Sequence, residues 1–332
     1  MKACVIAKPR AVAVDDWEDP SSAAGHVVVR VASCGVCGTD RHIVDGSYPA
    51  RYPNVLGHEI SGTISAVGQG VGRLTVGDRV AIDPNIFDGT CPACRRGDVH
   101  LCEQLQAVGV TLPGGMAPFV SVPAAQAHLV PDALPLESAA FSEPLSCIVH
   151  GLERARLQLG GHAVVLGAGS IGLMMLQALR SAGMANVTVS EPSAVKRELA
   201  EALGADEVYA PQMLDHGSHD DAYDLVVDCT GAVGVLKDAM RLARRGADVL
   251  LFGVAPKGAT SILEPYELYR KELRLVASNI NPFSMEKAIA LLASGAVKVD
   301  EIVSQPVALD DMPKLLTTAP APSDVKAALR FS

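Results

Sequence analysis

The sequence predicts an α/β protein with two domains, a β-rich, barrel-like domain followed by a doubly wound parallel sheet. The chain has 332 residues, which is enough for two domains with substantial cores. Roughly the first 140 residues contain short strand-like runs between glycine and proline turns. From Gly161 onward the pattern changes to apolar strands that alternate with helices, which is typical of a parallel sheet.

Each strand of the first domain is predicted from a short strand-like run. The amino-terminal stretch MKACVIAKPRAVAV contains the first run and lacks the long apolar core and cleavage site of a secretory signal. The runs HVVVRVAS, RVAID and FVSVP follow, and glycine and proline turns separate them. Short strands of this kind indicate a β-rich, barrel-like domain.

The second domain is predicted from six β-runs with helices between them, the pattern of a doubly wound sheet. The runs are HAVVL, NVTVSE, EVYA, DLVVDCT, DVLLFGV and LRLVAS. Helices are expected from Ser170, from Ser193 and near Val233. A further amphipathic helix is expected at SMEKAIALLASG, in the tail that begins at Asn279.

A glycine motif near the start of the second domain predicts a dinucleotide site. Gly167, Gly169 and Gly172 have the GxGxxG spacing, directly after HAVVL and at the start of an apolar helix that includes Ser170 and Ile171. Such glycines allow a tight turn, admit a pyrophosphate and let the helix pack on the strand.

Glu191 predicts which dinucleotide is preferred. It ends the next strand, 19 residues after Gly172, where a carboxylate accepts hydrogen bonds from the adenosine ribose and repels a 2′-phosphate. NAD is therefore favoured over NADP. Lys196 and Arg197 are the opposing signal, because they could approach a phosphate. On a helix after Glu191, such residues are more often solvated or stacked on adenine.

Two groups of residues have the spacing of metal ligands. The first group lies in one loop and comprises Asp88, Cys91, Cys94 and Cys102. This loop is too polar and too rich in turns for a core strand. The spacing lets it fold its thiolates around a tetrahedral ion, which predicts a structural zinc site.

The second group comes from distant segments, Cys37 and the triplet Gly57-His58-Glu59. Ligands from separate segments make an open site that leaves one coordination position for water or substrate. This group therefore predicts a catalytic zinc. A cysteine or a histidine considered alone is more often a buried core residue, so the assignment depends on the surrounding motifs.

Those motifs resemble the zinc-containing medium-chain dehydrogenases. GHEISGTISAVGQGV follows that family's zinc signature, CGVCGTDRHI resembles its zinc-ligand loop, and CPACRRGDVHLC resembles its structural-zinc lobe. SEPLSCIVHGL, GAGSIGLMMLQ, VSEPSAVKRELAEALGAD and YELYRKELRLVASNINPF look like the branch of sorbitol, butanediol, threonine and arabitol-phosphate dehydrogenases. The resemblance implies a GroES-like catalytic domain over 1–142 and 279–332, with the zinc lobe near 88–102, and a Rossmann NAD-binding domain over 143–278.

The resemblance also implies roles for single residues. Cys37 and His58 would be ligands of the catalytic zinc, and the third ligand would be Glu143 or Glu59, a choice that the sequence leaves open. Zinc on the substrate oxygen would lower its pKa and so promote hydride loss to nicotinamide. Thr39 and His42 would form the proton relay, and Asp40 would bind the second ring nitrogen of His58. Val254 and Ser278 would lie near the nicotinamide. His42 is nearly as well interpreted as a surface histidine.

One position departs from the family. The structural lobe of the family usually has four cysteines, and Asp88 replaces the first of them here. Aspartate can bind zinc, so a site of three cysteines and one aspartate is one interpretation, and weaker binding or loss of the metal is the other.

The expected function is an NAD-dependent zinc dehydrogenase that oxidises a secondary alcohol: a polyol, a sugar alcohol or a sugar-alcohol phosphate. The alternatives are a dehydrogenase of diols, simple alcohols or hydroxy-amino acids, and a non-catalytic relative. A formal net charge of −9 without a basic run argues against nucleic acid as a partner. Gln177 and Arg180 interrupt the most apolar stretch, which argues against a membrane span. We expect a cytoplasmic homodimer or homotetramer.

Overall fold

The computed structural model describes residues 1–214 and 217–331 and separates into two compact units. Unit 1 comprises Met1–Ser146, Asn281–Ala293 and Val303–Ser332. Unit 2 comprises Cys147–Ile280 and Ser294–Ile302. Helix α4 (Ser142–Arg154) is continuous across the first division, so a boundary after residue 142 has no break in secondary structure to mark it. The domain bounds expected from the sequence stay a prediction.

Unit 1 is built on sheets that are mostly antiparallel, with β17 and β18 pairing in parallel. A seven-stranded sheet has the order β10-β6-β5-β3-β18-β17, with β9 also paired to β3, and smaller sheets have the orders β2-β1-β4 and β7-β8. The strands of the large sheet are β3 (His26–Gly35), β5 (Glu59–Val67), β6 (Arg79–Ile82), β9 (Phe119–Pro123), β10 (Ala127–Leu129), β17 (Val303–Val307) and β18 (Lys326–Arg330). The others are β1 (Lys2–Lys8), β2 (Ala11–Asp16), β4 (Asn54–Val55), β7 (Asn85–Ile86) and β8 (Gln106–Ala107). The expected β-rich domain is confirmed.

Strand β3 brings segments that are distant in sequence to one place. It pairs antiparallel with β5, with Gly35 opposite Glu59. It also pairs antiparallel with β18, with Ala328 opposite Gly35. The end of β3 therefore lies between the first residue of β5 and the carboxyl-terminal strand of the chain.

The core of unit 1 packs on this sheet. Val29 and Val31 in β3 and Ile60 and Ile64 in β5 are at most 2% exposed and belong to one apolar cluster. Burial of each such side chain stabilises the fold by about 1.5–3 kcal/mol. The residues at the ends of these strands are therefore held on a rigid sheet.

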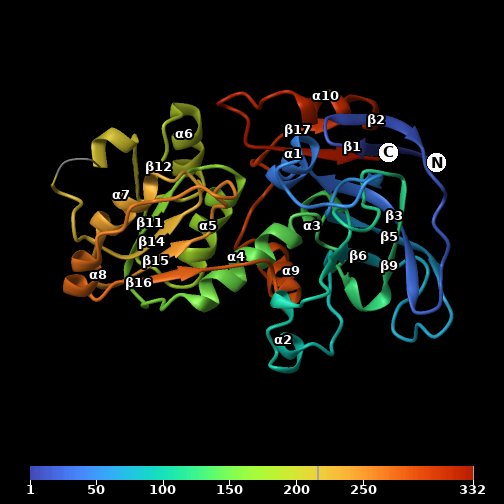
Figure 1. The fold of residues 1–332 in the computed structure, drawn as a ribbon, viewed down its shortest axis with the longest axis horizontal. Helices are drawn as coiled ribbons and strands as arrows, with labels where there is room; N and C mark the ends of the chain where they lie inside the picture. Colours follow the sequence, from blue (N-terminus) through green and yellow to red (C-terminus); the bar gives the residue numbers. More distant parts are fainter. Residues whose placement is uncertain (215–216, 332) are drawn as a thin grey trace. The chain divides into compact units, whose positions relative to one another are not determined.

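The helices of unit 1 are short. They are α1 (Gly38–Asp45), α2 (Pro92–Arg95), α3 (Leu136–Ala139), α9 (Met285–Ala293), α10 (Met312–Thr317) and the 3-10 turns η1 (Val99–Leu101), η2 (Ala124–Gln126) and η4 (Leu309–Asp311). Helix α9 is the one expected at SMEKAIALLASG. The segment that carries α2 projects from the rest of unit 1 (Figure 1).

Unit 2 contains the expected doubly wound sheet. Its six strands have the order β13-β12-β11-β14-β15-β16, and every pairing is parallel. The strands are β11 (His162–Leu166), β12 (Asn186–Ser190), β13 (Glu207–Tyr209), β14 (Tyr223–Asp228), β15 (Ala243–Leu251) and β16 (Arg274–Ala277). If the six strands are numbered 1 to 6 along the chain, their order in the sheet is 3-2-1-4-5-6, which is the strand order of dinucleotide-binding sheets.

Helices connect these strands, as the sequence predicts (Figure 1). They are α5 (Ser170–Ser181), α6 (Ala194–Ala202), α7 (Val235–Leu242), α8 (Pro265–Lys271) and the 3-10 turn η3 (Pro211–Leu214). Ala163, Val164 and Val165 of β11 are fully buried, because a parallel sheet is covered on both faces.

Within residues 1–214 and 217–331, none of the helices has both the length and the apolar character that crossing a bilayer requires.

Candidate metal centres and cofactor site

The first candidate metal centre brings Cys37, His58 and Glu59 together. One ligand atom from each lies within 4.8 Å of the other two. Cys37 caps the amino end of α1 just after β3, and His58 and Glu59 stand at the start of β5. The pairing of β3 with β5 therefore joins two segments that are separated in sequence.

Asp40 contacts both Cys37 and His58. It is fully buried, and its Oδ2 accepts a hydrogen bond from the backbone N–H of Cys37 at 2.8 Å. Its Oδ1 lies 3.5 Å from Nδ1 of His58. A carboxylate beside one imidazole nitrogen fixes the orientation of the ring and leaves the other nitrogen for a metal. This geometry fits the role that the sequence predicts for Asp40.

Lys326, which the sequence analysis missed, completes the surroundings of Glu59. Its Nζ donates to Oε1 of Glu59 at 2.5 Å, and the two side chains are 4% and 1% exposed. Burial lowers the pKa of Lys326, but the charges of Glu59, Cys37 and Asp40 and the hydrogen bond to Glu59 together outweigh it, so the pKa is raised and the lysine is charged. The buried carboxylate of Glu59 therefore has a cationic partner.

The second oxygen of Glu59, Oε2, lies beside Gly35. Among the described residues, Oε2 of Glu59 is buried without a partner. A Cβ atom on Gly35 would lie 1.9 Å from this oxygen, so a larger residue there would displace the carboxylate. Glycine at residue 35 thus leaves room for this buried oxygen.

Glu143 lies near this cluster but is not one of its three members. It is 8% exposed, in the first turn of α4. Burial raises the pKa of Glu143 to about 7, although the charge of His58 acts in the opposite direction. The group that the structure assembles contains Glu59, and whether Glu143 also binds a metal stays a prediction.

The donor set fits zinc. A cysteine sulfur, a histidine nitrogen and a carboxylate oxygen are the ligands that zinc takes in catalytic sites, and three protein ligands leave one position open. The unpartnered Oε2 of Glu59 is the acceptor that such a cation would satisfy.

Thr39 and His42 both lie on α1, downstream of Cys37. Thr39 is half-buried, whereas the side chain of His42 is 50% exposed. Nδ1 of His42 lies 3.2 Å from Oγ of Ser47 and 3.7 Å from Oδ2 of Asp45. The exposed imidazole is placed to exchange protons with solvent, and its part in a relay stays a prediction.

The second candidate metal centre contains all four residues of the predicted structural site. Ligand atoms from each member lie within 4.8 Å of one another, and the members are Asp88, Cys91, Cys94 and Cys102. Cys91 caps α2, and Cys102 follows η1. Two short helical turns thus fold the loop so that its thiols converge, a set that fits structural zinc.

Asp88 is held in its charged form. Its Oδ1 accepts backbone N–H groups of Thr90 at 2.5 Å and Cys91 at 2.8 Å. These hydrogen bonds hold the pKa of Asp88 far below its usual range. Its Oδ2 lies 3.4 Å from the sulfur of Cys102. The aspartate that replaces a cysteine is therefore an anion that points at the thiols.

The glycine motif forms the turn between β11 and α5. Gly167 has φ of +98°, a conformation that favours glycine. A Cβ atom on Gly172 would lie 1.8 Å from the carbonyl oxygen of Gly167, so the helix packs directly on the turn. Helix α5 begins at Ser170 and includes Ile171, and its amino end can bind a phosphate.

A cavity of about 410 Å³ opens beside this turn. Gly167, Gly169 and Glu191 line it, together with Cys229 and Thr230 at the end of β14. The cavity thus lies where the carboxyl ends of β11, β12 and β14 meet, the usual place for a dinucleotide in such a sheet.

The remaining predicted cofactor residues lie around the same sheet. Lys196 is half-buried on α6. Nη1 of Arg197 donates to the backbone oxygens of Glu191 and Pro192, at 2.7 and 2.8 Å. Val254 and Ser278 follow the carboxyl ends of β15 and β16. Their contacts with nicotinamide stay a prediction.

Two family models match the chain. Residues 23–132 match the alcohol dehydrogenase GroES-like domain, and residues 170–294 match the zinc-binding dehydrogenase model. The first match covers the Cys37 and Asp88 clusters, and the second begins at the start of α5.

Named relatives resemble the chain over nearly its whole length. It is 31% identical to D-arabinitol dehydrogenase 1 of Uromyces fabae, across 99% of this chain and 97% of that protein. It is 34% identical to D-altritol 5-dehydrogenase of Agrobacterium fabrum, across 90% and 89%. A zinc-binding dehydrogenase of Sinorhizobium meliloti, whose crystal structure contains NADP, superposes with a TM-score of 0.97, at 35% identity and 99% coverage of both chains.

Proposed function

Because this chain belongs to the zinc-binding dehydrogenases with an alcohol dehydrogenase GroES-like domain, we propose that it oxidises a secondary hydroxyl of a polyol, or of a related sugar alcohol or its phosphate, with NAD. The relatives that act on D-arabinitol and D-altritol support this substrate class. The observation that carries the proposal is the cluster of Cys37, His58 and Glu59, with Asp40 and Lys326 bonded to it.

Cys37 and His58 would hold the zinc, with Glu59 or Glu143 as the third ligand. A zinc ion in this place would polarise the substrate oxygen and lower the pKa of the hydroxyl. Asp40 holds the backbone of Cys37 and the ring of His58, so it sets the direction of two donor atoms. Lys326 donates to one oxygen of Glu59 and so fixes the orientation of this carboxylate.

The remaining residues serve the proton and the cofactor. Thr39 would accept the hydroxyl proton and pass it toward His42, whose exposed ring releases it to solvent. The glycine turn and the amino end of α5 would bind the pyrophosphate. Glu191 lines the cavity there and favours the 2′-hydroxyl of NAD over the 2′-phosphate of NADP.

A substrate panel tests the proposal. Polyols, polyol phosphates and diols would be assayed with NAD and with NADP, on wild-type protein and on Cys37→Ser. We expect NAD-linked oxidation of at least one polyol or polyol phosphate and none by the variant. Wild-type protein that binds zinc and NAD but oxidises no secondary alcohol would contradict the proposal.

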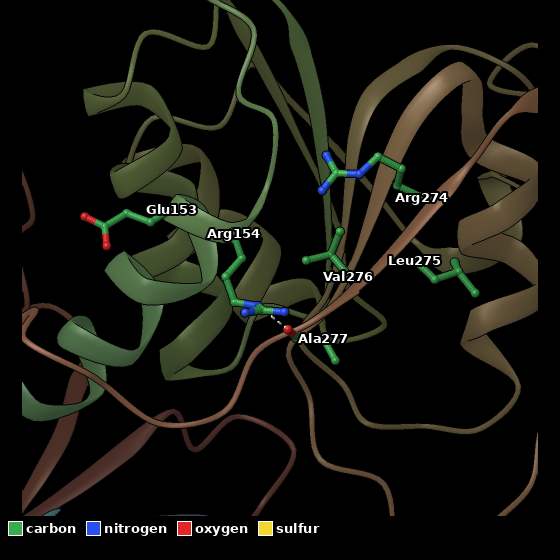
Figure 2. A pocket seen from close by; sticks show the side chains of 6 residues that line it. All are labelled: Glu153, Arg154, Arg274, Leu275, Val276 and Ala277. Atoms are coloured by element: carbon green, nitrogen blue, oxygen red, sulfur yellow. Dashed lines mark hydrogen bonds between the residues drawn. The ribbon is translucent and has the colours of Figure 1, made fainter. Parts of the chain in front are cut away.

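We also propose that the chain forms homodimers or homotetramers, and strand β16 supports this. It is an edge strand of the parallel sheet. An open hollow of about 510 Å³ lies beside it. Figure 2 shows the residues that line this hollow, Glu153, Arg154 and Arg274–Ala277. Arg154 donates to the Ala277 carbonyl at 2.6 Å. Exposed edges invite pairing with another strand, and an antiparallel pair about a twofold axis is self-complementary. A monomer by light scattering would exclude it.

A further inference from the structure

We propose that Glu191 is a positioning residue that holds the glycine turn of the cofactor site in shape, in addition to its expected contact with the ribose. The inference rests on the proposed function, because it concerns how this chain binds NAD. Glu191 directly follows β12 and is 7% exposed, so its carboxylate is largely removed from water. A buried carboxylate needs donors, and the structure supplies two from the backbone.

Both oxygens of the carboxylate accept backbone N–H groups. Oε2 accepts from Ala168 at 2.8 Å, and Oε1 accepts from Ser193 at 2.9 Å. Ala168 lies inside the glycine turn after β11, and Ser193 caps α6 after β12. One side chain therefore ties together the turns that follow two neighbouring parallel strands.

The glycine turn depends on this bond. Ala168 is fully buried, so its N–H has no water to replace Glu191 as the acceptor. A buried donor that loses its partner pays the full desolvation penalty. Gly167, the preceding residue, donates its own N–H to the carbonyl oxygen of Ser190 at 2.8 Å. Two successive amides of the turn are thus fixed by the end of β12.

Removing the carboxylate does not by itself create a site for a 2′-phosphate. Arg241 lines the same cavity, and its guanidinium pairs with Asp220. The guanidinium of Arg197 donates to the carbonyl oxygens of Glu191 and Pro192. It therefore stays bound to the backbone of the same segment whatever side chain stands at position 191.

Because of these contacts, substitution of Glu191 should weaken the binding of NADP, whereas a role on the ribose alone would strengthen it. Gln at position 191 offers one acceptor and one NH₂ donor, so it cannot accept from both Ala168 and Ser193. The turn would shift, and the turn binds the pyrophosphate that NAD and NADP share. Affinity for both cofactors would fall. If Glu191 acted on the ribose alone, its removal would weaken NAD and strengthen NADP.

The test uses three variants of the full chain. Glu191→Gln removes the charge at constant size, Glu191→Asp keeps the charge on a shorter side chain, and Glu198→Gln is the matched control, an exposed glutamate on α6. Calorimetric titration with NAD and with NADP gives Kd for each. Hydrogen exchange of ligand-free protein reports on the amide of Ala168.

For Glu191→Gln we expect Kd for NAD to rise about tenfold or more, the loss of one charge-assisted hydrogen bond. Kd for NADP should rise as well, and exchange at Ala168 should accelerate. Glu191→Asp should show the same changes at smaller size, and Glu198→Gln should match wild type. A lower Kd for NADP with unchanged exchange at Ala168, in either Glu191 variant, would overturn the inference. Wild-type protein that binds neither dinucleotide would refute the proposed function instead. Hydrogen exchange at the Ala168 amide of ligand-free protein would still decide whether Glu191 holds the turn.

Discussion

Replacement of Lys326 by methionine removes one partner of an ion pair in the interior of unit 1. The Nζ–Oε1 distance to Glu59 is 2.5 Å, and the side chains are 4% and 1% exposed, so solvent screens the pair very little. Loss of one partner leaves the other as an uncompensated buried charge, which costs about 3–5 kcal/mol. In a unit of roughly 150–250 residues this corresponds to a melting temperature lower by about 6–20 °C.

The assay is thermal unfolding of chelator-treated protein, because a bound cation would partly replace the charge of the lysine. Lys2→Met is the matched control, since Lys2 and Asp16 form an ion pair whose side chains are 58% and 82% exposed. An exposed pair contributes at most about 1 kcal/mol, so this control should melt close to wild type.

A double variant separates the charge effect from packing. In Lys326→Met with Glu59→Gln no unpaired charge is left, and replacing both members of a buried pair is often close to neutral. We therefore expect the double variant to melt above Lys326→Met alone. The reasoning is refuted if Lys326→Met melts within about 2 °C of wild type, or if the second substitution restores nothing.

Three further predictions follow from the metal centres and from the buried acids. Metal analysis should find close to two zinc ions per chain. Cys37→Ser should lose one of these ions and all turnover, whereas Cys94→Ser should lower the melting temperature. A fully active metal-free protein would contradict the predicted zinc sites. Glu143→Ala should lower kcat more than about 10-fold. Glu59→Ala should lower kcat equally if the two carboxylates alternate as ligands, and less if Glu143 is the resting ligand. Wild-type activity and zinc content in Glu143→Ala would contradict the predicted role of Glu143. Burial raises the pKa of Asp83 from 3.8 to about 6, so its contribution to the stability of unit 1 is complete below pH 3.8 and is lost as the pH rises to about 6. Denaturant unfolding across this pH range should therefore show the wild type losing stability relative to Asp83→Asn. Parallel pH profiles of the two proteins would show that the charge is not buried.

The features that the sequence predicted are those that one short segment encodes. The GxGxxG spacing needs only a strand, a turn and a helix in succession, and the structure has β11, the turn at Gly167 and α5 in that order. The four residues from Asp88 to Cys102 also lie in one loop, so their convergence follows from local spacing. In both cases the geometry is decided within about twenty residues.

Lys326 could not be predicted in the same way. Glu59 and Lys326 are separated by 267 positions, and they meet because β5 and β18 both pair with β3. In the sequence, Lys326 is an ordinary lysine in a short run near the carboxyl end, and lysine is usually exposed. Only the register of the sheet shows that this lysine is buried beside a carboxylate.

The predicted third zinc ligand shows the same limit. By resemblance Glu143 and Glu59 were both candidates, and no residue pattern separates two carboxylates on different segments. The structure places Glu59 within the cluster of ligand atoms and Glu143 in a buried position outside it. Which carboxylate could reach a shared ion depends on how β5 and α4 are placed in three dimensions, which the sequence does not encode locally.

A common arrangement links the three sites. Asp40 accepts the N–H of Cys37, Asp88 accepts the N–H of Cys91, and Glu191 accepts the N–H of Ala168. In each case an acidic side chain binds the backbone of the segment that carries the candidate ligand-binding groups. Charged acceptors make stronger hydrogen bonds than neutral ones, so the anion both shapes the loop and sets the local charge. Neutral amides at these positions should therefore disturb backbone geometry as well as electrostatics, which is why loss of binding in such variants cannot be attributed to charge alone.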